Sequence, residues 1–301
     1  MAAEVAENER RRGRARAGAP GPRYPGWLAL PALAWYVLFF IGPLAIMGAY
    51  SFAEASGFTD VAFNWNLGNY RYLWDPLYGE IFLRTLKLAL IGTAATLLIG
   101  FPFAYYLARY AKHKTLLLML VIVPFWTSFL IRTYSWLIML DPEFPLFRAL
   151  GIGRFVEDAE LLYTTKAIYI GVVYNYLPLM ILPLYAALER LDGRLLEAAH
   201  DLYGTRRAVL WRVTLPLTAP GIVAGSMLTF IPAAGDFINA ELLGTPRQYM
   251  IGNVIQSRYL ELTDYPTAAA LSFTLMALIL VLVLVWARVA GTESLMGSSE
   301  P

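Results

Sequence analysis

The sequence predicts an all-α integral membrane protein with six transmembrane helices. Three observations favour this fold class: an apolar composition, uncharged runs long enough to cross a bilayer, and basic residues concentrated in alternate connections. Hydrophobic residues make up 58% of the 301-residue chain and charged residues only 15%, whereas about a quarter of the residues in an average soluble domain are charged. The chain has no cysteine, so a disulfide framework and a thiolate metal site are both excluded.

Six nearly uncharged runs locate the expected spans, since about 20 helical residues cross the hydrocarbon core of a bilayer. The first run lies between Arg23 and Glu54 and is longer than the apolar region of a signal peptide, so we expect an uncleaved helix. Only the third run is interrupted, by Arg132. The six expected spans are residues 27–53, 88–108, 115–140, 167–188, 213–235 and 265–287.

The distribution of Lys and Arg sets the expected orientation. The amino-terminal arm, residues 1–26, carries six arginines, and the connections after the second and fourth spans are also basic. The other connections hold Glu54, Asp60, Asp75 and Glu80, and then Glu143, Glu157, Asp158 and Glu160. We therefore expect the arm and the tail at 291–301 in the cytoplasm and the loop at 54–80 in the periplasm. An arginine-rich arm can bind nucleic acid, but beside an apolar span we interpret it as a lipid-facing segment that sets topology.

Residues 190–216 predict a folded polar elbow between the fourth and fifth spans. Leu195, Leu196, Ala199, Leu202 and Tyr203 recur at helical spacing, with Glu197, His200 and Asp201 on the other side. Gly204 can take the left-handed conformation that ends this helix. Thr205 can cap a second helix that begins at Arg206. An amphipathic elbow on the basic side of a membrane protein predicts a docking surface for a soluble partner.

Several kinds of chemistry are missing from the sequence. It contains no GxxxxGK[ST] loop for ATP phosphates, no HExxH metal motif and no GxSxG nucleophile motif. The only histidines, His113 and His200, both fall in expected cytoplasmic connections. We therefore expect no cofactor, no metal site and no enzymatic activity of its own. If the protein drives active transport, the energy comes from another polypeptide or from an ion gradient.

Three stretches resemble a known family: PFWTSFLIRTYSWLIML at 124–140, EAAHDLYGTRRAVLWRVTLPLTAPGI at 197–222 and the stretch at 230–256. Through them, residues 81–290 resemble the transmembrane domain of type I ABC importer permeases. The second stretch is similar to the EAA loop that docks the ATPase subunit, and the other two resemble the spermidine/putrescine branch. The family has glycine at the seventh position of the EAA loop. Here Tyr203 occupies that position and Gly204 follows, which we interpret as a shifted helix cap.

The resemblance implies a permease subunit of the bacterial inner membrane that passes a small organic cation, putrescine or spermidine, into the cytoplasm. It implies three protein partners: an ABC ATPase subunit, a second homologous permease subunit, and a periplasmic or lipoprotein substrate-binding protein. It also implies the residues that couple the permease to the ATPase, namely Glu197, Ala198, Ala199, Asp201, Gly204, Thr205 and Arg206.

Arg132 and Asp236 are the ionisable residues at membrane depth, which makes each a functional candidate. Both are expected near the outer leaflet, so they could form a structural ion pair, or Asp236 could meet a substrate ammonium group, and the two are not exclusive. Asn239 would share the face of Asp236 one turn later. We assign Trp126, Arg132, Tyr134, Asn175, Asp236 and Asn239 to the translocation pathway. Most other aromatic residues at this level, Tyr176 among them, are expected in an interfacial belt.

Two other classes of protein fit parts of the pattern. An ion-coupled secondary transporter would need internal repeats or broken helices around a midplane site, and the sequence shows no convincing repeat. A non-transporting scaffold would use the elbow only to hold a partner. Within the ABC class, the substrate could also be another small organic ion. Copurification with an ATPase would separate the classes.

Overall fold

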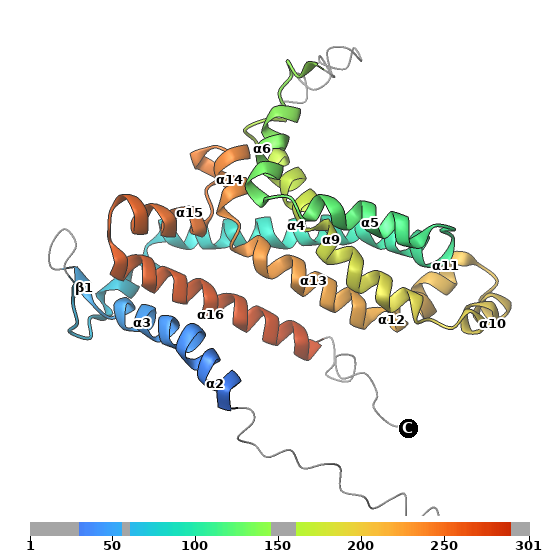
Figure 1. Ribbon diagram of the computed structural model, residues 1–301, viewed down its shortest axis with the longest axis horizontal. Helices are drawn as coiled ribbons and strands as arrows, with labels where there is room; N and C mark the ends of the chain where they lie inside the picture. Colours follow the sequence, from blue (N-terminus) through green and yellow to red (C-terminus); the bar gives the residue numbers. More distant parts are fainter. Residues whose placement is uncertain (1–29, 56–60, 146–160, 290–301) are drawn as a thin grey trace, which may run out of the picture. The chain divides into compact units, whose positions relative to one another are not determined.

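The computed structural model describes residues 30–55, 61–145 and 161–289, and these residues are mainly helical (Figure 1). The chain divides into two compact units, Met1–Ala49 and Tyr50–Pro301, which we describe one at a time. The expected arm and tail, and four acidic residues of the expected outer loops (Asp60, Glu157, Asp158 and Glu160), lie outside the described residues. Four described helices are long and apolar enough to cross a membrane, and two bent helix pairs bring the number to six if each pair is one span.

The described part of the first unit is one apolar helix. It begins as α2 (Leu30–Tyr36), passes through a π-helical segment η2 (Val37–Ile41) and continues as α3 (Gly42–Ser51), whose last two residues belong to the second unit. Large side chains such as Trp35 and Phe39 are exposed. A helix that is apolar on all sides suits a lipid environment, so the first expected span is present as a helix from Leu30 onward.

The second span is longer than expected, because α4 (Pro76–Arg109) has 34 residues. Asp75 fixes its start: the Oδ1 atom accepts the Leu77 N–H at 2.9 Å, and Pro76 occupies a first-turn position where no N–H is needed. The early turns are polar and include an ion pair between Glu80 and Arg84 at 2.8 Å. An uncharged run therefore marks only the apolar part of a helix whose first turns are polar.

The third expected span is wrong as one continuous helix. α5 (Lys114–Phe125) and α6 (Phe129–Met139) replace it, and they are bent by 93° relative to each other. Pro124 lies at the end of α5 and has no N–H to continue the helical ladder. Ser128 then takes an extended backbone, with ψ at 136°, which turns the chain before α6.

The fifth expected span is divided as well. The segment Arg206–Leu217 ends in α12 (Leu215–Leu217), and the chain bends by 68° before α13 (Ala219–Ala234). Pro216 and Pro220 flank the bend, and their fixed φ and missing N–H shape the entry to α13. Gly235 and Asp236 then leave the helical conformation, and the short helix α14 (Phe237–Leu243) follows.

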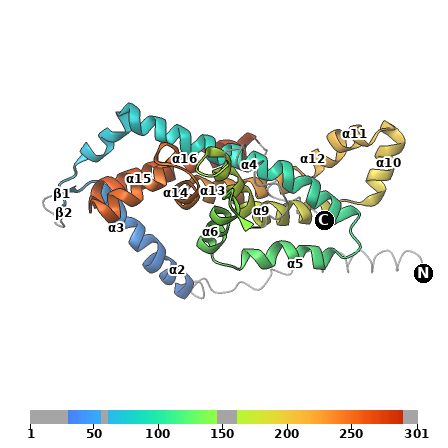
Figure 2. The same ribbon diagram turned by 90° about the horizontal axis from the view of Figure 1, so that it is seen from above.

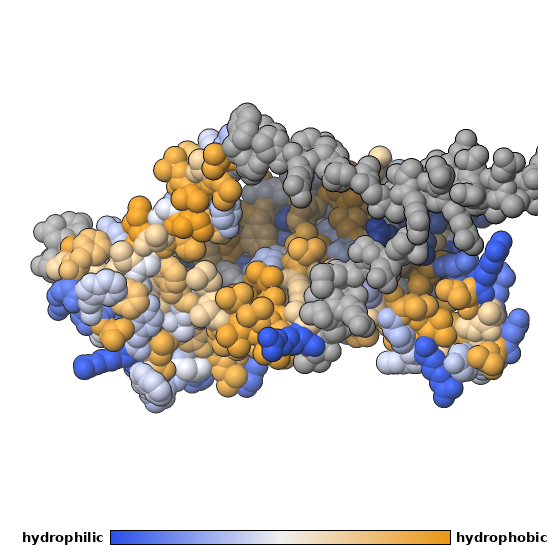
Figure 3. Space-filling model, turned by 90° about the horizontal axis from the view of Figure 1, so that it is seen from below, coloured by the Kyte–Doolittle hydropathy of each residue, from blue (hydrophilic) through white to orange (hydrophobic). Residues whose placement is uncertain are grey.

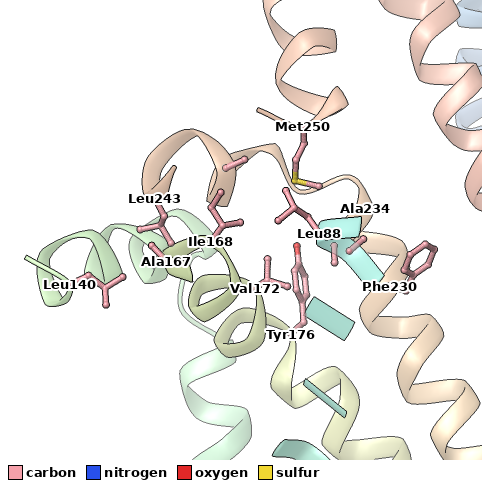
Figure 4. Packing of buried hydrophobic residues seen from close by; sticks show 13 residues of the cluster. Leu88, Leu140, Ala167, Ile168, Val172, Tyr176, Phe230, Ala234, Leu243 and Met250 are labelled. Carbon is pink, nitrogen blue, oxygen red and sulfur yellow. The ribbon is translucent and has the colours of Figure 1, made fainter. Parts of the chain in front are cut away.

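The fourth span, α9 (Thr165–Glu189), is the central helix of the second unit. It packs against both α4 and α13. Figure 4 shows Val172 and Tyr176 of α9 beside Leu88 of α4, within one buried cluster that also includes Phe230 of α13. Glycines let the helices approach closely: a Cβ added at Gly225 of α13 would lie 3.0 Å from the Met180 carbonyl oxygen of α9.

The sixth span, α16, matches its expected range closely and packs against α15. Two short strands pair antiparallel, with Glu54 opposite Ala62. The elements not yet bounded are β1 (Glu54–Ala55), β2 (Val61–Ala62), η3 (Leu67–Trp74), α10 (Gly193–Tyr203), α11 (Arg206–Val209), η4 (Leu210–Thr214), η5 (Pro246–Gln248), α15 (Ile251–Gln256), η6 (Ser257–Glu261) and α16 (Tyr265–Val289).

Candidate functional site

The elbow folds as two capped helices. Asp192 caps the start of α10 by accepting the Arg194 N–H at 2.9 Å. Gly204 ends α10 in the left-handed region with φ at +67°, and its N–H donates to the His200 carbonyl at 2.8 Å. The Thr205 hydroxyl oxygen accepts the Ala208 N–H at 3.3 Å and caps α11. The left-handed glycine and the threonine cap are confirmed, because both follow from local backbone chemistry.

The apolar side of α10 is only partly covered by this chain. Ala199 is buried, but Leu195 is exposed and Leu202 is 76% exposed. Glu197, Ala198, Asp201 and Arg206 are also exposed. α10 packs mainly against α11 and η4, at the end of the helices opposite α15 (Figures 1 and 2). Hydrophilic residues gather at this end of the helices, which is on the right in Figure 3.

A cavity of about 430 Å³ lies where α5, α6, α9 and the α13–α14 junction meet. The α5–α6 break and the junction between α13 and α14 both contribute residues to it. Its lining combines two charged side chains, one amide and several rings. The lining residues are Phe125, Phe129, Arg132, Asn175, Tyr176, Leu179, Pro232, Gly235, Asp236, Phe237 and Ile238.

Asp236 is the residue that starts α14. It is 5% exposed, and its Oδ1 atom accepts the Asn239 backbone N–H at 3.1 Å. Its Oδ2 atom accepts the Tyr176 hydroxyl at 3.1 Å and the Asn239 side-chain amide. The expected ion pair with Arg132 is not among the ion pairs of the described residues. Local donors already satisfy most of the carboxylate, which removes the need for that partner.

Arg132 lies in the same cavity but interacts differently. It is 7% exposed, and its Nη1 atom donates to the Asn175 carbonyl oxygen at 3.4 Å. The guanidinium carbon lies 5.0 Å from the centre of the Phe125 ring and 5.7 Å from that of Phe129. Both distances are within the range of a cation–π interaction. The guanidinium is therefore held mainly by ring faces.

A buried polar network joins α6, α9 and α14 behind the cavity. The Asn175 side-chain amide donates to the Thr133 hydroxyl oxygen at 3.1 Å and to Asn239 Oδ1 at 3.4 Å. The Thr133 hydroxyl also donates to Asn239 Oδ1 at 3.4 Å. All three residues are fully buried. Buried polar networks of this kind rigidify the elements they connect.

The structure brings together four of the six expected pathway residues. Arg132, Asn175 and Asp236 line the cavity, and Asn239 binds Asp236. Trp126 and Tyr134 do not line it: they are 79% and 50% exposed, because the break after α5 turns them away from α9.

Two contributors to this site, Tyr176 and Thr133, are not among the residues predicted from the sequence. Tyr176 was expected in the interfacial belt, but it binds Asp236. Its position directly after Asn175, deep in an apolar span, is the signal that could have identified it.

Residues 97–290 match the family described as the binding-protein-dependent transport system inner membrane component. The chain belongs to this family, the permease subunits of ABC importers. The permease is 42% identical, over 85% of its length and 94% of the relative's, to the Escherichia coli spermidine/putrescine transport system permease protein PotB. It is 40% identical to PotB of Haemophilus influenzae over 85% of this chain and 90% of that protein. It is also 36% identical to the E. coli inner membrane ABC transporter permease protein YdcU, over 84% and 85% of the two chains.

Solved structures support the fold of the permease. A bacterial ABC transporter that imports the acidic polysaccharide alginate covers 88% of this chain, with 95% of its own chain matched, a TM-score of 0.55 and 19% identity. The MetNI methionine ABC transporter covers 74%, with 96% of its chain matched, a TM-score of 0.51 and 18% identity. At such low identity the likeness extends to the fold alone.

Replacing Asp236 by leucine is expected to lower the amount of assembled permease several-fold. The change leaves the Asn239 donors without a partner and leaves the Tyr176 hydroxyl only the Pro232 carbonyl oxygen at 3.5 Å, and each unsatisfied buried group costs about 1–3 kcal/mol. Asp236→Asn keeps one acceptor oxygen and should retain more protein. The measurement is the monodisperse fraction after detergent extraction.

Adding Arg132→Met to Asp236→Leu should not restore assembly of the permease, because the two side chains form no ion pair. Recovery in this double variant would contradict the hydrogen-bonding role of Asp236 and favour an ion pair instead.

Proposed function

We propose that this permease passes polyamines, putrescine and spermidine, into the cytoplasm, driven by ATP hydrolysis on a separate ATPase subunit. The observation that carries the proposal is the 42% identity to PotB across 85% of the chain. A second homologous permease subunit and a periplasmic or lipoprotein substrate-binding protein complete the proposed assembly. One of the solved relatives is an alginate ABC transporter in complex with a substrate-bound periplasmic protein, and its TM-score to this chain is 0.55.

The chemistry of the cavity supports an organic cation. An ionised carboxylate has about four acceptor positions, and hydrogen bonds from Tyr176 and Asn239 fill three of them at Asp236. One position remains for an ammonium N–H. The Phe125 and Phe129 rings add faces that attract cations. Weak, distributed contacts suit a pathway from which the substrate must leave again.

The proposed topology has six spans, with both termini and the elbow at 190–216 in the cytoplasm and the transmembrane domain at 81–290. It counts each bent helix pair as one crossing. Supporting it, the basic end of α4 lies next to the elbow: Arg109 Nη2 donates to the carbonyls of Leu188 and Leu191 at 2.9 and 3.0 Å. Lys114 also lies 3.4 Å from Glu189. Two basic connections thus meet at one end of the helices, as the positive-inside rule requires.

The exposed face of α10 is the proposed ATPase-docking surface. The coupling residues expected on α10 are Glu197, Ala198, Ala199 and Asp201, of which Ala199 is buried, and those expected directly after it are Gly204, Thr205 and Arg206. Leu195 and Leu202 are exposed beside them, which suits a surface that another protein covers. The broken helices around the cavity also suit an ion-coupled transporter, but membership of the ABC importer family favours the ATPase-driven mechanism.

The test is uptake by the reconstituted transporter. The permease is coexpressed with its ATPase, second permease and binding protein, and ATP-dependent accumulation of labelled putrescine and spermidine is measured in proteoliposomes. We expect saturable uptake that requires both ATP and the binding protein. Uptake of an amino acid or a sugar in place of polyamines would contradict the substrate class. A permease that copurifies with no ATPase would contradict the coupling.

A further inference from the structure

Arg132 occupies its position in the cavity through interactions that are not specific to a guanidinium. It carries five N–H donors, yet its one hydrogen bond among the described residues is the 3.4 Å contact with the Asn175 carbonyl oxygen. Its Nε atom is buried and has no partner among the described residues. It also takes part in none of their ion pairs. A buried charge with so few partners is weakly held.

The groups that surround the Arg132 guanidinium would attract cations in general. The Phe125 and Phe129 ring faces and the Asn175 backbone carbonyl oxygen all attract positive charge. Asn175 lines the same cavity, and its side-chain Oδ1 atom is fully buried and has no hydrogen-bond donor in the described part of the chain. A compact ammonium with three donors could use both oxygens and the rings.

We infer that Phe125, Phe129 and the two Asn175 oxygens form a cation seat in which Arg132 is a tethered occupant, and that an ammonium group of the substrate takes its place. This inference rests on the proposed function and names how the cavity receives its substrate. Two positive charges cannot share a cavity of about 430 Å³ at low cost, so occupation by the substrate and by Arg132 is exclusive.

A tethered occupant also explains why a positive residue lines a pathway for cations. While Arg132 is in this position, its charge repels small inorganic cations and its guanidinium occupies the Phe125 and Phe129 ring faces. A polyamine ammonium delivered at high local concentration can displace the side chain. Asp236 is not the group that holds Arg132 in place, because the two side chains form no ion pair among the described residues.

Ligand binding to the purified permease–ATPase complex tests the inference. The shift of the thermal midpoint Tm, which reports binding to the folded state, is titrated with putrescine, with methylguanidinium and with the neutral diol 1,4-butanediol. Arg132→Met removes the tethered charge but keeps an unbranched stem. If Arg132 fills the seat about nine-tenths of the time, this variant should bind both cations about ten-fold more tightly than wild type. The diol should give no shift.

Two further variants make the titration specific to the seat. Adding Phe129→Leu to Arg132→Met removes a ring face and should cancel the gain in affinity. Ser135→Ala, on the exposed side of α6, is the matched control and should titrate like wild type. An unchanged or weaker affinity in Arg132→Met would overturn the inference. If that variant does not assemble, Arg132→Gln decides: it removes the charge but keeps a polar side chain with an amide donor, and an affinity equal to wild type would overturn the inference.

Failure of the proposed function gives a different result. If the wild-type transporter carries no polyamine, the proposed substrate class is contradicted. Methylguanidinium still tests the cation seat in that case, because it has the guanidinium group that Arg132→Met removes. If the transporter carries polyamines but the Arg132 variants bind no cation more tightly than wild type, only the role of Arg132 as a tethered occupant is contradicted.

Discussion

Replacing Gly221 by leucine is expected to abolish assembly of the permease. Gly221 lies on α13, where it faces α9. A Cβ added there would collide with the Ala187 side chain and lie 2.8 Å from the Pro183 carbonyl oxygen. Overpacking a core commonly costs about 1–3 kcal/mol and sometimes more. Here the obstacle includes backbone, which cannot rotate away as a side chain can.

The measurement is the yield and Tm of the detergent-extracted complex. Gly79→Ala in α4 is the matched control, because a Cβ at that position meets nothing within 4 Å and alanine favours helix by up to about 1 kcal/mol. Gly221→Ala should fall between the two. Wild-type yield for Gly221→Leu would show that α9 and α13 do not pack as closely as described.

Replacing Gly204 by valine is expected to reduce ATP-driven uptake to background while the protein still inserts in the membrane. Gly204 has φ at +67°, a conformation that costs roughly 1–2 kcal/mol for a residue with a side chain and more for a β-branched one. The end of α10 would shift and its proposed docking face would no longer fit the ATPase. Glu197→Lys, which reverses an exposed charge on α10, should act in the same direction.

Uptake and ATP hydrolysis are measured on the same proteoliposomes, at equal amounts of inserted permease. Gly204→Asn is the control, since asparagine tolerates the left-handed region and should keep most of the uptake. If both Gly204→Val and Glu197→Lys import at the wild-type rate, the elbow is not the coupling element. If Gly204→Val is absent from the membrane, Glu197→Lys alone decides.

Local chemistry determined which parts of the fold could be predicted. The cap at Thr205 and the left-handed Gly204 depend on neighbouring backbone groups, and both were correct. The fourth and sixth spans were placed within a few residues, because their apolar runs end where the helices α9 and α16 end. The start of α4 was misplaced because its first turns carry charges.

Interactions between distant segments could not be predicted in the same way. Pro124 and Pro232 lie near the ends of α5 and α13, but a proline alone does not specify a 93° bend or the turn before α14. If both spans were straight, Arg132 and Asp236 would lie at a similar depth in the membrane, and this suggested an ion pair between them. The bends instead bring Tyr176 and Asn239 to the carboxylate, and Trp126 and Tyr134 are directed away from the cavity.

The length of α4 has a mechanical consequence. Its 34 residues form a rod about 51 Å long. At one end Arg109 binds the carbonyls beside the elbow, and near the other the Thr85 hydroxyl oxygen accepts the Ile251 N–H of α15 at 2.9 Å. A push on the elbow that displaces α4 along its axis would therefore reach α15 directly. One helix would then transmit movement between the two faces of the membrane without involving the cavity.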